Sequence, residues 1–350
     1  MRNPRSFARF AATAAVLTTA ALAVTACASS AAPATAEDGH GDLTVQLSWI
    51  LNEEWSGELI AQDRGYFTDA GFADVTLVPG PSSGVAELLS GTADIALTDA
   101  VSIGAAVANE GAPLKVVGAT FQKNPFTITS LADGADIRTP EQLIGKKIGV
   151  QDANRPVFDA FLAANDIAPD ELEIVPVQYD PAPLTTGEVD GLIAFVTSQS
   201  VTLTVQGFAV TDLLFADNGL PFVGHVVTAT DETIASDREV LKDFLRAEIR
   251  GWTDAVADPT LGATLAVETY SADLGLSPET SLASATAQAE LLVVSDETTA
   301  NGLFTVSPEL QEQTIASLAA AGFRLDVADL FDLSLLAEVY EETPDLLARS

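Results

Sequence analysis

The chain has 350 residues, 47% of them hydrophobic, and a formal net charge of −34. So acidic a surface repels phosphate backbones and anionic headgroups, which argues against nucleic acid or peripheral membrane binding by the folded part. The hydrophobic content excludes a disordered body. Because the chain has only two His and one Cys, a His/Cys metal site or a Cys–His nucleophile is nearly excluded, and we expect neither metal nor cofactor.

Residues 1–26 have the form of a secretory signal peptide. Arg2, Arg5 and Arg9 provide a basic start, and residues 10–26 carry no charge. After this leader, no uncharged apolar run approaches the ~20 residues that a membrane-spanning helix needs. The segment therefore predicts export of the protein.

Cys27 follows an aliphatic residue at position 24 and a small residue at position 26. This spacing resembles the lipobox of bacterial lipoproteins, and an ordinary signal peptide that ends near a Cys is the alternative. We expect cleavage before Cys27, lipidation of its thiol, and attachment to the outer side of the cytoplasmic membrane. Residues 27–42 are rich in Ala, Ser, Pro and Thr and then acidic, which predicts a flexible tether.

From residue 43 onward, strand-like runs alternate with helical runs, as in an α/β protein with mostly parallel sheets. Gly65 and Gly111 end two of the early helices, and the Pro/Gly/Ser-rich residues 79–84 form a turn. In chain order, the first part predicts strands at 43–47, 75–78, 94–97 and 114–119, with helices at 54–63, 85–90 and 101–109.

A second strand–helix series begins near residue 127, and Thr139-Pro140 starts one of its helices. Beyond Asp237 the chain reads mainly as helix, and residues 240–256 place their apolar side chains on one face. The second series predicts strands at 127–129, 146–150, 173–177, 191–196 and 225–229.

These runs predict two α/β lobes. Residues 43–130 and 223–350 make the first lobe, and residues 131–222 form a second lobe inserted into it. The chain would cross between the lobes twice, near residues 126–130 and 221–224, and two crossings restrict motion to opening and closing about one hinge.

Six short segments, in this order and spacing, carry a family resemblance. They are Leu47–Asn52, Ala61–Phe67, Leu89–Ala96, Phe121–Phe126, Gly145–Val150 and Gly187–Gly191. Over essentially all of residues 43–350 the chain resembles the solute-binding proteins of ABC importers, in the branch that binds thiamine-precursor pyrimidines such as hydroxymethylpyrimidine. Sulfonate and nitrate binding proteins are cousins of this branch. One departure is that members often carry a His a few residues after Asn52, where this chain has Glu53, Glu54 and Trp55.

The resemblance implies a periplasmic-binding-protein type II fold and a monomer that delivers a small heteroaromatic nutrient to permease subunits. Riboflavin, a sulfonate such as taurine, and nitrate are alternative ligands. The rival class is a pyrimidine-synthesising enzyme of the same fold that uses pyridoxal phosphate, with a Cys-rich motif and a Lys/His pair. Here Cys27 is expected to be lipidated and His40 lies in the tether, which leaves His225 alone. We therefore expect no enzymatic activity.

Ligands of two-lobed α/β proteins bind at the carboxyl ends of the strands. A planar heterocycle needs aromatic faces and an amide edge, which Trp49, Asn52 and Trp55 offer after the first strand. A core position is the alternative for Trp49. Ser82, Ser83 and Asp99 follow the next two strands, and turn formation or helix capping is their alternative.

Further candidates lie between the predicted lobes and in the second lobe. Arg155 is one of few cations, where an anionic ligand would bind first, with a surface salt bridge as the alternative. Trp252, in contrast, is expected in the core. The candidates are Phe121, Gln122 and Phe126 between the lobes, and Asp152, Asn154, Arg155, Tyr179, Phe195, Thr197, Ser198 and Gln199 in the second lobe.

Overall fold

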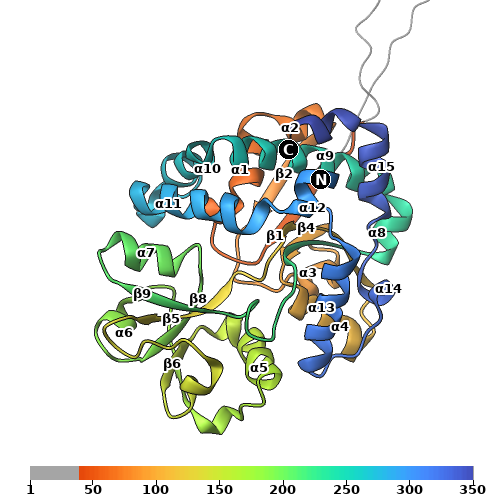
Figure 1. Cartoon of the computed structure of the whole chain (residues 1–350). Helices are drawn as coiled ribbons and strands as arrows, with labels where there is room; N and C mark the ends of the chain where they lie inside the picture. The colour runs from red at the N-terminus through yellow and green to blue at the C-terminus, as the bar shows by residue number, and fades with distance from the viewer. Residues whose placement is uncertain (1–38, 350) are drawn as a thin grey trace, which may run out of the picture. The chain divides into compact units, whose positions relative to one another are not determined.

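The computed structural model describes residues 39–349, whose strands form two five-stranded sheets (Figure 1). The first sheet has the order β2-β1-β3-β10-β4 and the second has the order β7-β6-β8-β5-β9. The expected signal peptide, the expected lipidation site Cys27 and most of the predicted tether lie outside the described residues. The strands are β1 (Gly41–Leu47), β2 (Phe72–Val78), β3 (Ile95–Thr98), β4 (Leu114–Phe121), β5 (Phe126–Leu131), β6 (Lys147–Val150), β7 (Glu173–Pro176), β8 (Gly191–Phe195), β9 (Val210–Leu214) and β10 (Gly224–Thr230).

The sheets are mixed, whereas the sequence predicted mostly parallel pairing. β1 runs parallel to β2 and β3, and β6 runs parallel to β7 and β8. β10 runs antiparallel to both of its neighbours, as does β5. These two strands follow the segments by which the chain passes from one sheet to the other, so they enter their sheets from the opposite end.

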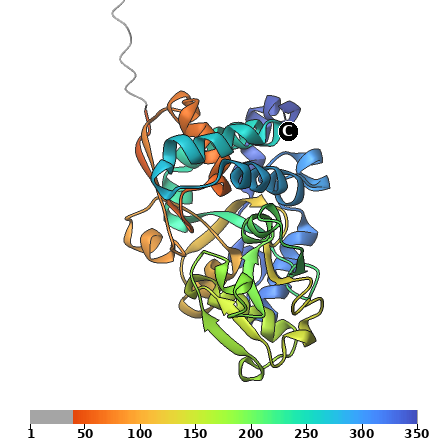
Figure 2. The same ribbon diagram turned by 90° about the vertical axis from the view of Figure 1, so that its left-hand side faces the viewer.

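The predicted strands are present within a few residues of their expected ends, and β9 was missed. The expected helix after Thr139 is only a 3₁₀ turn, Pro140–Leu143. β1 begins at Gly41, so the last residues of the predicted tether belong to the first sheet. The described residues, 39–349, pack as one unit, and the proposed lobe boundaries and hinge motion remain predictions. In Figure 2, which is turned by 90° from Figure 1, the first strands and most of the C-terminal helices lie in the upper part of the picture. Most of the yellow-green middle of the chain lies below them.

Helices surround both sheets, and none within residues 39–349 is long and apolar enough to cross a membrane. Two π-helical turns, Ala266–Tyr270 and Ala289–Val293, extend α10 and α11. The helices are α1 (Ser56–Asp63), α2 (Tyr66–Asp69), α3 (Val85–Ser90), α4 (Ala100–Glu110), α5 (Arg155–Ala164), α6 (Ala182–Thr185), α7 (Gln199–Val205), α8 (Asp231–Ser236), α9 (Arg238–Ala257), α10 (Pro259–Leu265), α11 (Pro278–Gln288), α12 (Asp296–Asn301), α13 (Pro308–Ala320), α14 (Val327–Leu330) and α15 (Ser334–Glu342).

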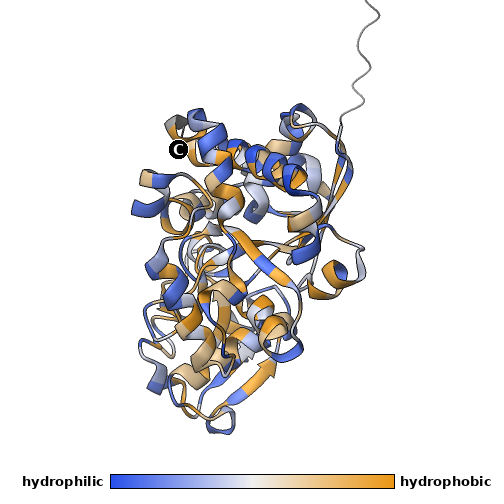
Figure 3. Ribbon diagram, turned by 90° about the vertical axis from the view of Figure 1, so that its right-hand side faces the viewer, coloured by the Kyte–Doolittle hydropathy of each residue, from blue (hydrophilic) through white to orange (hydrophobic). Residues whose placement is uncertain are grey.

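The core of the first sheet packs against α1, α9 and α15. The predicted apolar face of α9 is confirmed, because Leu241, Phe244, Ile249 and Trp252 are all buried. Figure 3, coloured by hydropathy, shows that individual helices carry both hydrophilic and hydrophobic residues. The predicted core position of Trp252 is likewise confirmed.

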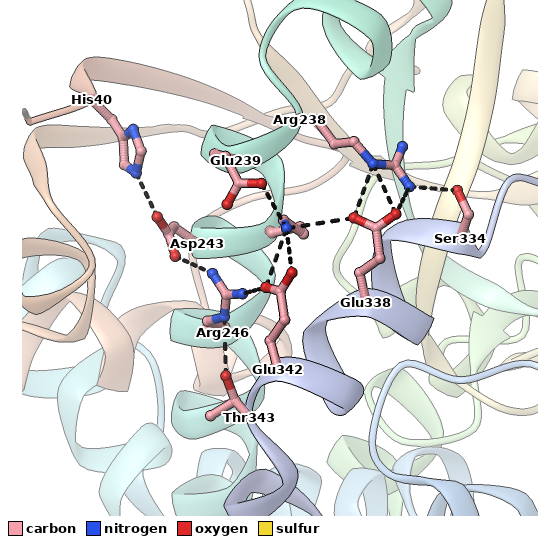
Figure 4. A network of polar contacts seen from close by, with 10 residues as sticks. His40, Arg238, Glu239, Asp243, Arg246, Ser334, Glu338, Glu342 and Thr343 are labelled. Atoms are coloured by element: carbon pink, nitrogen blue, oxygen red, sulfur yellow. Dashed lines mark hydrogen bonds and ion pairs between the residues drawn. The ribbon is translucent and has the colours of Figure 1, made fainter.

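A polar network joins the outer side of α9 to α15 (Figure 4). Lys242 is buried at its centre, with only 4% of its side chain exposed, and pairs with Glu239 at 2.6 Å and Glu342 at 2.9 Å. Arg238 binds Glu338 with two nitrogens. The hydrogen bonds from Lys242 to Glu239 and Glu342, together with the charges of these carboxylates, raise the pKa of Lys242. The network therefore holds α15, near the end of the chain, against α9.

Two carboxyl groups are buried between α1 and α9. Trp252 Nε1 donates to Glu58 Oε1 at 3.2 Å, and the carboxyl groups of Glu58 and Glu248 can hydrogen-bond to each other when one of them is protonated. Burial raises the pKa of Glu248 well above its ordinary value of 4.5, and the charge of Glu58 raises it further. Folding therefore favours the protonated form of Glu248.

We expect Glu248→Gln to stabilise the protein at neutral pH. A raised pKa in the folded state means that wild type is fully stabilised below about pH 4.5 and loses stability as pH rises toward the folded pKa, at up to about 1.4 kcal/mol per pH unit. Gln carries no such dependence. Urea unfolding of both proteins from pH 4 to 8 should show a gap in unfolding free energy that widens with pH, and a gap constant with pH would contradict the argument.

Candidate functional site

A cavity of about 370 Å³ opens where the carboxyl ends of the parallel strands meet the beginnings of the two antiparallel strands. Segments after β1, β2 and β3 form one side, and segments after β6 and β8 form the other. The first residues of β5 and β10 complete the wall. The lining residues are Ser48, Trp49, Glu54, Pro81, Ser82, Ser83, Thr98, Asp99, Ser102, Pro125, Phe126, Asp152, Ala153, Asn154, Pro156, Phe195, Ser198, Gln199, Phe222, Gly224 and His225.

More than half of the predicted site residues line this cavity, although their contact with a ligand remains a prediction. Trp49 is half-buried, and its ring centre lies 6.1 Å from that of Tyr179. Phe126 and Phe195 meet edge to face at 4.7 Å. The candidates that line the cavity are Trp49, Ser82, Ser83, Asp99, Phe126, Asp152, Asn154, Phe195, Ser198 and Gln199.

Two of these polar residues, Asp99 and Ser82, form hydrogen bonds that stabilise the local main chain. Asp99 caps α4, because its Oδ1 accepts from the Ser102 amide at 2.8 Å and its Oδ2 accepts from the Ser102 hydroxyl at 2.7 Å. Ser82 Oγ accepts from the Gly84 amide at 3.0 Å and donates to Glu87. In this structure Asp99 therefore acts as a helix cap and Ser82 stabilises a turn, which are the alternative roles predicted for them.

Two aromatic candidates lie behind the cavity wall. Trp55 and Phe121 are fully buried and enclose the His225 imidazole from both faces, with ring centres at 4.6 and 3.9 Å from it. Trp55 Nε1 also donates to the Ile50 carbonyl at 3.0 Å. Both rings therefore stack on a protein side chain, which occupies the faces that we expected a ligand to use.

Three other polar candidates also lie outside the lining. Asn52 is buried, and its Oδ1 accepts from the Glu54 amide at 3.3 Å, which caps the 3₁₀ turn Glu53–Trp55. Gln122 Nε2 donates to two main-chain carbonyls. Arg155 is exposed and pairs with Asp159 at 2.7 Å, one helical turn later. It therefore forms the surface salt bridge that was the alternative to a ligand contact.

Tyr179 supports the wall from outside the lining. Its hydroxyl lies 3.1 Å from Ser198 Oγ, and either oxygen can donate. Burial raises the pKa of Tyr179 to about 12, so the phenol stays protonated at neutral pH.

The pair formed by Glu54 and His225 was not predicted from the sequence. Glu54 Oε1 lies 2.7 Å from His225 Nε2, and both side chains are at least nine-tenths buried. His225 also has a left-handed backbone, with φ of 44°. A His at the start of the largely buried strand β10 was the available signal, because an imidazole buried in a strand needs a polar partner.

The cavity wall is acidic. Glu54, Asp99 and Asp152 line it, and no Lys or Arg is among its lining residues. Within residues 39–349 no three His, Cys, Asp or Glu side chains are placed to hold a metal ion. The wall can therefore hydrogen-bond donors and stack on flat rings, but it offers little to neutralise an anion.

Comparison with known proteins agrees with this architecture. Residues 52–261 match the profile of the family described as NMT1/THI5 like. A riboflavin-binding protein, RibY, of Chloroflexus aurantiacus is 25% identical over 319 residues, which cover 85% of this chain and 86% of RibY. A 4-amino-5-hydroxymethyl-2-methylpyrimidine phosphate synthase of Legionella pneumophila is 25% identical over 218 residues, or 60% of this chain and 67% of the synthase.

A solved structure shows the fold. The periplasmic aliphatic sulphonate binding protein SsuA of Escherichia coli superposes with a TM-score of 0.61 at 15% identity, covering 84% of this chain and 98% of SsuA. The protein thus has the periplasmic-binding-protein fold, as the sequence predicted.

Proposed function

The chain belongs to the NMT1/THI5 like family, and we propose that it is the solute-binding component of an ABC importer for a small nitrogen heterocycle. A thiamine-precursor pyrimidine is the first candidate. The observation that carries this proposal is the cavity wall, which combines Trp49, Phe126, Phe195 and Phe222 with carboxylates and lacks Lys and Arg. Flat rings stack on aromatic side chains, and carboxylates bind N–H donors.

Riboflavin is the second candidate ligand, because RibY is similar along most of both chains. Its isoalloxazine ring is also flat and carries an N–H group. Taurine and nitrate fit less well, since an anion would face three acidic side chains with no Lys or Arg in the lining.

We also propose that the protein acts without catalysis, as a lipoprotein on the outer face of the cytoplasmic membrane. Tethering through Cys27 would keep it near the permease, and two acyl chains suffice for stable attachment. Mass spectrometry of the membrane-extracted protein would find the acyl groups on Cys27. An unchanged heterocycle after long incubation would support binding over the synthase-like alternative, and a new product would refute it.

The ligand class is tested by a thermal-shift screen followed by calorimetry. Pyrimidines and riboflavin should raise the melting temperature, while taurine and nitrate should not. Trp49→Ala should weaken heterocycle binding about tenfold, because one stacking contact contributes about 1–1.5 kcal/mol. Tight taurine or nitrate binding without any response to heterocycles would contradict the proposed ligand class.

A further inference from the structure

Glu54 is a buried carboxylate on the wall of the cavity. It follows β1 on a 3₁₀ turn, and only 7% of its surface is exposed. A charge in such a position is costly unless it is hydrogen-bonded. His225 Nε2, at 2.7 Å from Oε1, provides one such bond. When Glu54 is ionised, its carboxylate only accepts hydrogen bonds, so in that state Nε2 is the donor to Oε1.

The surroundings hold this pair in one position. The His225 ring cannot turn, because Trp55 and Phe121 lie against its two faces. The main chain of the 3₁₀ turn is also held, since Gln288 Nε2 donates to the carbonyls of Glu53 and Glu54, each at 3.3 Å. The carboxylate is therefore preorganised before any ligand arrives.

Hydrogen-bonding capacity remains at this end of the cavity. Glu54 Oε2 has no hydrogen-bond partner among residues 39–349, and it is not one of their fully enclosed unpaired atoms, so it keeps accessible surface beside the cavity. Thr98, a lining residue that is 1% exposed, has a hydroxyl without a partner among the same residues. Leaving an enclosed hydroxyl such as that of Thr98 unpaired is unfavourable, and a ligand can form hydrogen bonds with both Thr98 and Glu54 Oε2.

We propose that Glu54 Oε2 accepts a hydrogen bond from an N–H of the bound heterocycle, with His225 as the residue that positions Glu54. This inference rests on the proposed function and narrows it to ring systems with an imide N–H or an amino group. A ring whose nitrogens are all alkylated would be rejected, because it would leave the carboxylate buried without a donor.

Glu54→Gln changes this contact without changing its shape. The Gln oxygen still accepts from His225 Nε2, so the amide NH₂ takes the place of Oε2 and turns an acceptor into a donor. Two probe pairs report the change: riboflavin with its N3-methyl analogue, and 4-amino-5-hydroxymethyl-2-methylpyrimidine with its dimethylamino analogue. For whichever probe pair binds, wild type should bind the N–H member at least tenfold more tightly than its alkylated analogue. Glu54→Gln should lose most of that preference.

Glu53→Gln is the matched control, because Glu53 is a buried carboxyl on the same turn but does not line the cavity. It should keep the wild-type preference. If a heterocycle binds wild type and Glu54→Gln keeps the full preference for its N–H form, the role of Glu54 is refuted while the receptor function stands. If none of the four probes binds wild type, the proposed ligand class is refuted and this inference falls with it.

Discussion

Ser102→Trp should abolish ligand binding, whatever the ligand is. Ser102 lies in the first turn of α4, is half-buried, and lines the cavity. An indole at this position would occupy a large part of the cavity of about 370 Å³ from the side of the first sheet. A ligand would have to displace it at a cost of roughly 2–3 kcal/mol, so affinity should fall about a hundredfold or more. Calorimetry with whichever heterocycle binds wild type measures the loss.

The fold should survive this change. The Ser102 amide keeps its bond to Asp99 Oδ1, so the cap of α4 is retained, and only the bond from the hydroxyl is lost. Ser236→Trp is the control, because Ser236 is exposed on α8 and does not line the cavity. Unchanged affinity in Ser102→Trp, with an unchanged melting temperature, would mean that the ligand binds elsewhere.

The sequence predicted the parallel part of this site well. Loops after parallel strands meet at one sheet edge, so Trp49, Ser83 and Asn154 could be placed near the cavity from strand order alone. The same rule failed for β10. This strand enters its sheet antiparallel, so its beginning and not its end reaches the cavity, and His225 was left out of the predicted site.

Side-chain direction was the second limit of the sequence. Trp55 and Phe121 have the residue type that a heterocycle needs, and both lie next to the cavity wall. Spacing cannot say whether such a ring faces a ligand or another side chain, and here both rings face His225. Their burial follows from packing between segments more than sixty residues apart, which no local pattern encodes.

Gly251→Ala should destabilise the protein severely, by about 3 kcal/mol or more. α1 and α9 lie side by side (Figure 1), and their main chains touch at this point. A Cβ on Gly251 would come within 2.1 Å of the Gly57 carbonyl oxygen, and a Cβ on Gly57 would come within 2.1 Å of the Trp252 ring. Main-chain atoms cannot move aside as a flexible side chain can, so the two helices would have to separate.

The sign of this effect is diagnostic. In the interior of a helix, Gly→Ala normally stabilises by up to about 1 kcal/mol, because Ala has the higher helix propensity. Thr253→Ala, two residues later on α9 and half-buried, is the control and should change the unfolding free energy by about 1 kcal/mol or less. Urea unfolding measures both variants. A neutral or stabilising Gly251→Ala would show that α1 and α9 do not touch through their main chains.

The same variant should weaken ligand binding. α1 begins at Ser56, directly after the turn that carries Glu54, so a displaced α1 moves that carboxylate away from His225. We expect affinity for the bound heterocycle to fall together with stability in Gly251→Ala and to remain at the wild-type level in Thr253→Ala. Wild-type affinity in a strongly destabilised Gly251→Ala would show that the Glu54 turn keeps its position independently of α1.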